Sequence, residues 1–243
     1  MIAKRGCVPE DEKFFSPDAV KTLRKASAHV FYLLNEGYDL KQATAFVGNH
    51  FLLSERQRLA VMRSLASREQ LAERERNKIS LNALAGRELW VDGFNTVITL
   101  EVMECGSPLF LGMDGCIRDL AALRGTYRLI PETGKAVHRL SRQLKAAGTG
   151  TVHILLDRPV SNSGRLRTLI AEIGEETGCD YDIRITDDVD RILYGKENVV
   201  SSDSIILDRC QSWVNLVSGC AAESGASVLQ VWDSEYNNQG ERI

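Results

Sequence analysis

Three aspartates in this chain follow short apolar stretches. Asp92 follows Glu-Leu-Trp-Val, Asp157 follows Ile-Leu-Leu, and Asp203 follows Val-Val-Ser-Ser. If these stretches are strands of one parallel sheet, their carboxyl ends meet at one edge, where open α/β sheets bind ligands. Carboxylate oxygens suit hard cations, and Mg²⁺ or Mn²⁺ held there can activate water for phosphodiester cleavage. We therefore predict Asp92, Asp157 and Asp203 as catalytic residues, with Asp92 and Asp203 as metal ligands.

Asn95 stands close to the first of these aspartates in the sequence. Gly93 permits a sharp turn after Asp92, and the amide of Asn95 could then hold that carboxylate or a substrate oxygen. We count Asn95 among the predicted substrate-binding residues. The alternative interpretation is that Asn95 caps the helix that follows. Asp187 and Asp188, which end another strand-like stretch, are further candidates for the acidic site.

A second acidic segment covers residues 112–120 and reads Gly-Met-Asp-Gly-Cys-Ile-Arg-Asp-Leu. We predict that Asp114 and Asp119 join the metal site and that Arg118 contacts the substrate. Simpler interpretations remain open for all three residues. An Asp-Gly pair is typical of a turn or a helix start, and adjacent Arg and Asp residues inside a helix can form a solvated ion pair.

The segment after Asp157 combines small polar residues with arginines. Residues 158–165 read Arg-Pro-Val-Ser-Asn-Ser-Gly-Arg and lead into a predicted helix. The free N–H groups of a helix start attract anions, and a nearby guanidinium adds positive charge. We predict that Asn162, Ser163 and Arg165 bind a substrate phosphate. The alternative is an ordinary loop between a strand and a helix.

Motifs for several other chemistries are absent from the sequence. There is no G-x-x-x-x-G-K-[ST] loop, no G-x-G-x-x-G motif and no G-x-S-x-G nucleophile elbow. The six cysteines form no C-x-x-C pair, which favours free thiols in a reducing compartment over a zinc site. A phosphatase that forms an aspartyl-phosphate usually has a second aspartate two residues after the first. Phe94 occupies that position here.

The bulk composition limits the classes of protein that fit. Hydrophobic residues make up 44% of the 243 residues and charged residues 26%, which is close to the globular average. The net charge of −3 gives no overall positive field, so nucleic-acid binding needs a local basic patch. No apolar run approaches the ~20 residues of a membrane span. We expect a soluble, cytoplasmic protein with no membrane partner.

Residues 1–80 predict a small all-helical region. Ser16 precedes proline at the start of one helix, and Ser54 with Gln57 forms a capping box for another that runs to about residue 78. Arginines and glutamates alternate along this last helix. The pattern is typical of a solvated, salt-bridged helix, and the alternative is a basic arm that grips RNA phosphates.

Residues 81–243 predict an α/β domain with a mainly parallel sheet. Short apolar runs alternate there with helical stretches, the pattern of β-α units. The predicted strands are 88–92, 108–112, 152–157, 181–186, 198–201 and 227–232, and the predicted helices are 95–104, 115–123, 133–147, 163–177 and 204–219.

Together these motifs resemble the PIN-like nuclease superfamily. Asp-Gly-Phe-Asn at 92–95, Leu-Leu-Asp ending at Asp157 and Ser-Ser-Asp ending at Asp203 carry the likeness. It implies a PIN-like three-layer α/β/α fold for residues 81–243, with Asp92 and Asp203 as metal-binding acids and Asn95 as the accompanying amide. Asp114 or Asp119 would then supply an acid from an intervening helix.

The chain as a whole also resembles a prokaryotic family, domain of unknown function 434, which implies no established activity. The segments that carry this resemblance are 5–12, 47–50, 92–95, 118–121 and 156–165. From the acids we predict a ribonuclease that depends on Mg²⁺ or Mn²⁺, with RNA as its partner, and a homodimer is compatible with this interpretation. The alternative is a non-catalytic RNA-binding module on the same fold, and a small-molecule phosphatase ranks third.

Overall fold

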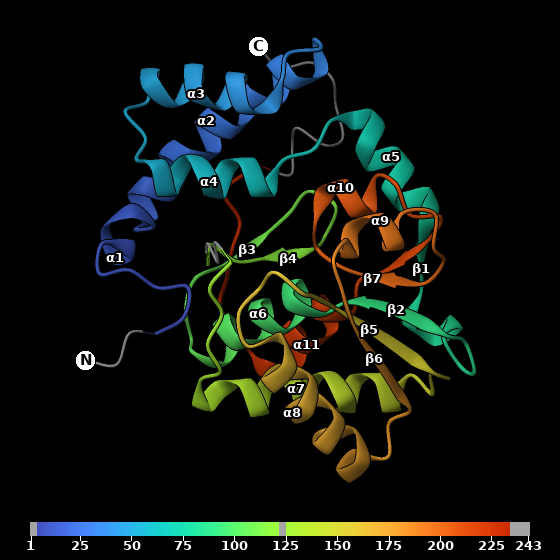
Figure 1. The fold of residues 1–243 in the computed structure, drawn as a ribbon. Helices are drawn as coiled ribbons and strands as arrows, with labels where there is room; N and C mark the ends of the chain where they lie inside the picture. Colours follow the sequence, from blue (N-terminus) through green and yellow to red (C-terminus); the bar gives the residue numbers. More distant parts are fainter. Residues whose placement is uncertain (1–3, 122–124, 234–243) are drawn as a thin grey trace.

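The computed structural model describes residues 4–121 and 125–233, and its centre is a six-stranded parallel sheet (Figure 1). Every hydrogen-bonded pair of neighbours in this sheet is parallel. The strands lie in the order β1 (Lys78–Ile79), β8 (Trp213–Val214), β7 (Val199–Val200), β2 (Leu89–Asp92), β5 (Val152–Asp157) and β6 (Tyr181–Thr186).

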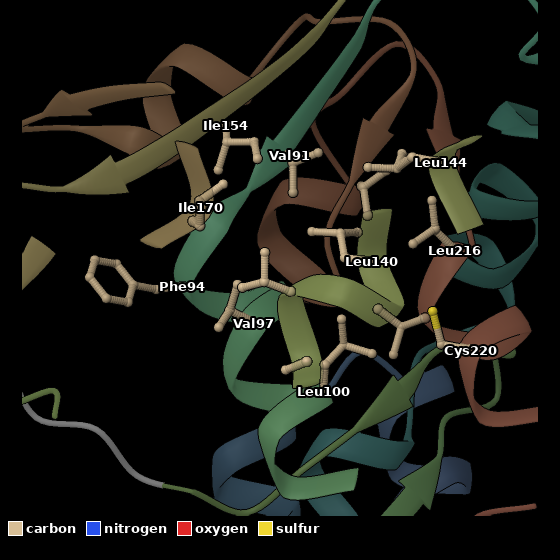
Figure 2. Packing of buried hydrophobic residues seen from close by; sticks show 14 of the residues in the cluster. Val91, Phe94, Val97, Leu100, Leu140, Leu144, Ile154, Ile170, Leu216 and Cys220 are labelled. Atoms are coloured by element: carbon tan, nitrogen blue, oxygen red, sulfur yellow. The ribbon is translucent and has the colours of Figure 1, made fainter. Parts of the chain in front are cut away.

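Helices cover both faces of this sheet. Side chains alternate across a strand, so neighbouring residues of one strand contribute to opposite layers. Ile154 belongs to the larger core, whereas Leu155 packs on the other face with Trp213. Figure 2 shows Val91 and Ile154 in the same core as the helical residues Ile170 and Leu140. The larger core holds α6 (Gly93–Glu104), α7 (Pro131–Ala146), α8 (Ser163–Thr177) and α11 (Leu216–Ser224), and the opposite layer holds α9 (Val189–Leu193) and α10 (Ser204–Leu207).

The N-terminal region is helical, as predicted, and it packs on a second, smaller sheet. That sheet has the order β4 (Ile117–Arg118), β3 (Leu109–Leu111) and β9 (Val228–Leu229). Phe15 and Val61 of the helical region share a core with Phe110 of β3 and with Leu120 and Val231. The helices are α1 (Asp11–Phe14), α2 (Pro17–Asn35), α3 (Leu40–His50), α4 (Glu55–Ser64) and α5 (Arg68–Asn77), and a short 3-10 helix covers Leu81–Ala83.

The prediction of one long helix from residue 55 to about 78 is wrong. The helix ends at Ser64, because Leu65 adopts an extended conformation and is buried together with Ala66. Ser67 then caps α5 with its own capping box. After α5 the chain enters β1, which joins the edge of the six-stranded sheet. The division of the chain into domains at residue 80 stays a prediction.

Two further helix predictions are wrong. Within the predicted helix 115–123, residues 117–118 form strand β4, and the segment 122–124 lies outside the described residues. Asp119 is therefore not in a helix. The predicted helix 204–219 is interrupted by β8, where Trp213 is completely buried between neighbouring elements. The predicted strands 88–92, 152–157 and 181–186 and the helix 163–177 are confirmed to within one residue.

All six cysteines are free, as expected from their spacing. Among the residues that the structure describes, none of the helices combines the length and the apolar character needed to cross a membrane.

Candidate functional site

The candidate site lies where the chain order of the central sheet reverses. From β2 the chain continues to β5 and β6 on one side, and it later returns to β7 and β8 on the other side. Because these strands are parallel, the carboxyl ends of β7, β2 and β5 lie side by side. Ligands of open α/β sheets bind outside the strand ends at such a reversal. Asp92 ends β2 and Asp157 ends β5, as the sequence predicts.

Asp92 is a buried carboxylate that forms no ion pair with any of the residues that the structure describes. Its side chain caps α6 by accepting a hydrogen bond from the Asn95 N–H at 3.3 Å, and Ser201 Oγ donates to it at 2.9 Å. Burial, reinforced by the charges of Asp203 and Asp157, raises the pKa of Asp92 to about 7, against the effect of these hydrogen bonds. At neutral pH the ionised form of Asp92 is therefore disfavoured, and a nearby cation would stabilise it.

The Asn95 side chain holds the loop that carries Asp203. Asn95 Oδ1 accepts hydrogen bonds from the N–H and the hydroxyl of Ser202, both at 2.9 Å. Asp203 caps α10 through the Ile205 N–H at 2.7 Å, and its own N–H donates to Ser201 Oγ at 3.0 Å. The residue that caps α6 is thus Asp92 and not Asn95. These bonds place Asn95 and the loop of Asp203 beside Asp92.

Asp190 is a fourth acid at this edge, and it is not among the residues predicted from the sequence. Burial raises the pKa of Asp157, and the charges of Asp190 and Asp188 add to this effect. Burial likewise raises the pKa of Asp190, with further contributions from Asp203 and Asp188. Asp190 therefore interacts electrostatically with both Asp157, which ends β5, and Asp203, which follows β7. The available signal was an aspartate in the first turn of a helix directly after a strand.

The other two acids after β6 have local partners. Asp188 caps α9 by accepting from the Arg191 N–H at 3.1 Å. Asp187 forms an ion pair with Arg158 at 2.9 Å, and both side chains are exposed. The charge of Asp188 also acts on Asp157.

The carboxylates at this edge suit a hard cation that keeps several of its waters, and they do not form a closed metal cage. Within residues 4–121 and 125–233, no three Asp, Glu, His or Cys side chains are grouped closely enough to hold an ion by themselves. Mg²⁺ commonly binds through one or two carboxylates and keeps several waters. Asp92 and Asp203 place two carboxylates at this edge, and burial is the main reason why the pKa of Asp92 is raised.

Asp114 does not face this edge as a free ligand, because it lies in a buried ion-pair network. Asp114 Oδ2 is 2.7 Å from Arg74 Nη1 and 2.6 Å from Arg118 Nη2, and the Cys116 N–H donates to Oδ1 at 3.0 Å. Although burial acts in the opposite direction, the charges of Arg118 and Arg74 hold the pKa of Asp114 far below its usual value. Arg118 Nε also donates to the Ser202 carbonyl at 2.8 Å.

Asp119 is also occupied by neighbouring groups. Thr99 Oγ1 donates to Asp119 Oδ2 at 2.7 Å, and the Ala121 N–H donates to Oδ1 at 2.7 Å. Arg63 approaches the same carboxylate at 3.6 Å. Neither Asp119 nor Asp114 is among the charges that raise the pKa of Asp92. The structure therefore groups Asp92, Asp157 and Asp203 and leaves the two intervening acids in other networks.

The predicted phosphate-binding loop is anchored by a hydrogen bond to the backbone of Tyr127. Asn162 has a left-handed backbone conformation with a φ of 62° and donates from Nδ2 to the Tyr127 carbonyl at 2.6 Å. Its side chain does not cap α8, which begins at Ser163. The Arg165 side chain in the first turn is exposed to solvent. This loop follows β5 directly, so it lies next to Asp157 in the chain.

Comparisons with known proteins identify relatives without a stated activity. A family model described as "Domain of unknown function (DUF5616)" matches residues 81–219, and one described as "Protein of unknown function (DUF434)" matches residues 22–77. The "Uncharacterized protein MJ0935" of Methanocaldococcus jannaschii is 32% identical over 186 residues, 76% of this chain and 89% of that protein. No solved structure matches the chain. The resemblance to domain of unknown function 434, expected for the chain as a whole, is confirmed for residues 22–77.

Proposed function

The chain belongs to the family described as domain of unknown function DUF5616, and we propose, from its own residues, that it is a metal-dependent ribonuclease. The observation that carries this proposal is the position of Asp92 and Asp203 on either side of the reversal in the central sheet. Ligands of open α/β sheets bind there. Both residues provide oxygen ligands, and the buried Asp92 has a pKa raised to about 7 beside other acids.

In this proposal each part of the edge has a separate task. Asp92 and Asp203 would hold Mg²⁺ or Mn²⁺, and the bound ion would supply an activated water and charge stabilisation for the leaving oxygen. Asn95 keeps the Ser202 loop, and with it Asp203, beside Asp92. Asp157 and Asp190 would add negative charge to the acidic edge, which consists of Asp92, Asp157, Asp190 and Asp203.

We assign substrate binding to the loop between β5 and α8. The N–H groups at the start of α8, near Ser163, attract an RNA phosphate, and exposed Arg165 adds a positive charge. Asn162 shapes this loop through its bond to the Tyr127 carbonyl. The PIN-like assignment of the α/β part is a proposal of the same kind, supported by acids at adjacent strand ends of a doubly covered parallel sheet.

A non-catalytic RNA-binding module is the second candidate function. It is favoured by the engagement of Asp114 and Asp119 with arginine and threonine side chains, which leaves fewer acids for an ion. In that case the phosphate-binding loop acts alone, and RNA binding requires Arg165 but neither a divalent cation nor Asp92.

The deciding experiment compares RNA cleavage by the wild type and by Asp92→Asn, with labelled mixed cellular RNA and Mn²⁺. A matched control is Asp180→Asn, because Asp180 is an exposed aspartate that precedes β6 at the opposite edge of the same sheet. We expect Asp92→Asn to lose about 100-fold or more of the activity, since metal-based charge stabilisation is worth several kcal/mol. The control should keep wild-type activity.

The proposal fails if the wild type and Asp92→Asn cleave RNA equally. RNA binding without any cleavage, unchanged in Asp92→Asn and lost in Arg165→Ala, would support the second candidate function instead.

A further inference from the structure

Arg118 is a buried arginine whose side chain hydrogen-bonds to two separate segments, at Asp114 and at Ser202. Its Nε donates to the Ser202 carbonyl at 2.8 Å, while Nη1 and Nη2 donate to the two oxygens of Asp114 at 2.8 and 2.6 Å. The guanidinium is planar, so the paired bonds to Asp114 fix the direction in which Nε points. The position of the Ser202 carbonyl is thereby tied to Asp114.

The loop that carries Asp203 is consequently held from both sides. On one side, Asn95 accepts from the N–H and hydroxyl of Ser202. On the other side, Arg118 binds the carbonyl of the same residue. Every polar backbone group of Ser202 therefore has a fixed partner, and the adjacent Asp203 cannot shift relative to Asp92 without breaking one of these bonds.

A second buried arginine extends this connection to the helical region. Arg74 of α5 donates from Nη1 to Asp114 at 2.7 Å and from Nε to Asp208 at 2.7 Å. It also reaches the Ser204 carbonyl at the start of α10 at 3.3 Å. The carbonyl of Arg74 accepts from Trp213 Nε1 at 2.7 Å. Helix α5 thus contacts both ends of the short helix that Asp203 caps.

The space around Arg118 is shaped for this residue. A Cβ atom at Gly112 would lie 2.0 Å from Arg118 Nη1 and 2.6 Å from Asp114 Oδ1, so a larger residue would displace the ion pair. Buried ion pairs add little net stability compared with apolar side chains of similar volume. One role proposed for such pairs is to fix the geometry of charged and hydrogen-bonded groups, and here the fixed groups include the Ser202 carbonyl next to Asp203.

We propose that Arg118 is a positioning residue that sets the distance between Asp92 and Asp203, and that Arg74 makes this setting depend on the helical region. The inference rests on the proposed function for the identity of the ion. Arg118 itself does not contact the substrate in this assignment, because its Nε and both Nη atoms bond within the protein.

The experiment compares Arg118→Lys with Arg56→Lys. Lysine keeps the charge but cannot bind Asp114 and Ser202 at once. Arg56 is a matched control, because it also pairs with a buried aspartate, Asp11, and donates to backbone carbonyls, but lies outside the acidic edge. Three readouts are measured: melting temperature, Mn²⁺ affinity by titration, and the kcat and KM of RNA cleavage.

We expect Arg118→Lys to lower Mn²⁺ affinity by about 10–100-fold, the usual effect of removing a group that orients a metal ligand. The kcat should fall with little change in KM, because the phosphate-binding loop is untouched. Arg56→Lys should lower the melting temperature to a similar degree and leave Mn²⁺ affinity at the wild-type value. Equal Mn²⁺ affinity and kcat in the two variants would overturn the inference.

A metal-free measurement separates this inference from the proposed function. Amide hydrogen exchange of a peptide covering residues 199–208 should be faster in Arg118→Lys than in Arg56→Lys. Wild-type protein that binds no Mn²⁺ would refute the proposed ribonuclease, but the exchange result would still test the positioning role. Unchanged exchange in Arg118→Lys would overturn that role.

Discussion

Replacing Asp92 with asparagine should stabilise the folded protein at alkaline pH, although the same change removes the proposed activity. Burial raises the pKa of Asp92 from 3.8 to about 7 in the folded protein. An acid with a raised pKa weakens the fold when it ionises, because unfolding transfers the charge to water. The wild type should therefore lose stability as this group titrates, whereas Asp92→Asn should not.

The expected magnitude follows from the two pKa values. Below pH 3.8 the carboxyl is protonated in both the folded and the unfolded protein, so it contributes no difference. Between 3.8 and about 7 the unfolded state loses its proton first, and the free energy of unfolding falls as the pH rises. Roughly three pKa units correspond to about 4 kcal/mol. Asp92→Asn should exceed the wild type by up to this amount at pH 8 and match it at pH 4.

Urea unfolding followed by circular dichroism at pH 4, 6 and 8, with a chelator present, measures this difference. Asp180→Asn serves again as the control and should follow the wild type at every pH. Adding Mn²⁺ at pH 8 should then stabilise the wild type by mass action and leave Asp92→Asn unchanged. A variant that is equally destabilised at pH 4 and pH 8 would refute the reasoning, because it would show that Asp92 acts only as a helix cap.

Two further predictions concern the ion-pair network and the phosphate-binding loop. Gly112→Ala should destabilise the protein by about 1–3 kcal/mol in urea unfolding, because the new Cβ overlaps Arg118 and Asp114. Gly134→Ala, where a Cβ meets nothing within 4 Å in α7, should be neutral or stabilising, and equal effects would contradict the overlap argument. Arg165→Ala should weaken RNA binding and reduce the slope of its salt dependence by about 1, as measured by fluorescence anisotropy. The exposed Arg142→Ala on α7 is the control, and an unchanged slope in Arg165→Ala would exclude a phosphate contact.

The strands that bear the acids could be predicted because both of their faces are buried. Parallel strands between two helical layers need apolar residues on both faces, and this requirement appears in the sequence as a continuous apolar run. The predicted range 152–157 matches β5, and the predicted range 88–92 differs from β2 by one residue. Capping residues such as Ser16 and Ser54 could be recognised for a similar local reason.

Two of the short strands could not be predicted from periodicity. Strands β4 and β8 each have only two residues, too few to show an alternating pattern. Trp213 reads as part of an apolar helix in the sequence, but its burial between neighbouring elements and its bond to the Arg74 carbonyl place it in a strand. Tertiary packing thus overrides local preference in the predicted helix 204–219.

By itself, the sequence determined that Asp92, Asp157 and Asp203 follow apolar strands, because strand burial and loop polarity are local properties. Only the tertiary structure decided which charges meet. Asp114 binds Arg74, 40 residues earlier in the chain. Asp190 approaches Asp157 and Asp203 because it lies in α9, the connection from β6 to β7, and these two strands flank β5 and β2 in the sheet. Pairing over such separations depends on how the elements pack and on which charges are buried, and neither leaves a periodic pattern in the chain.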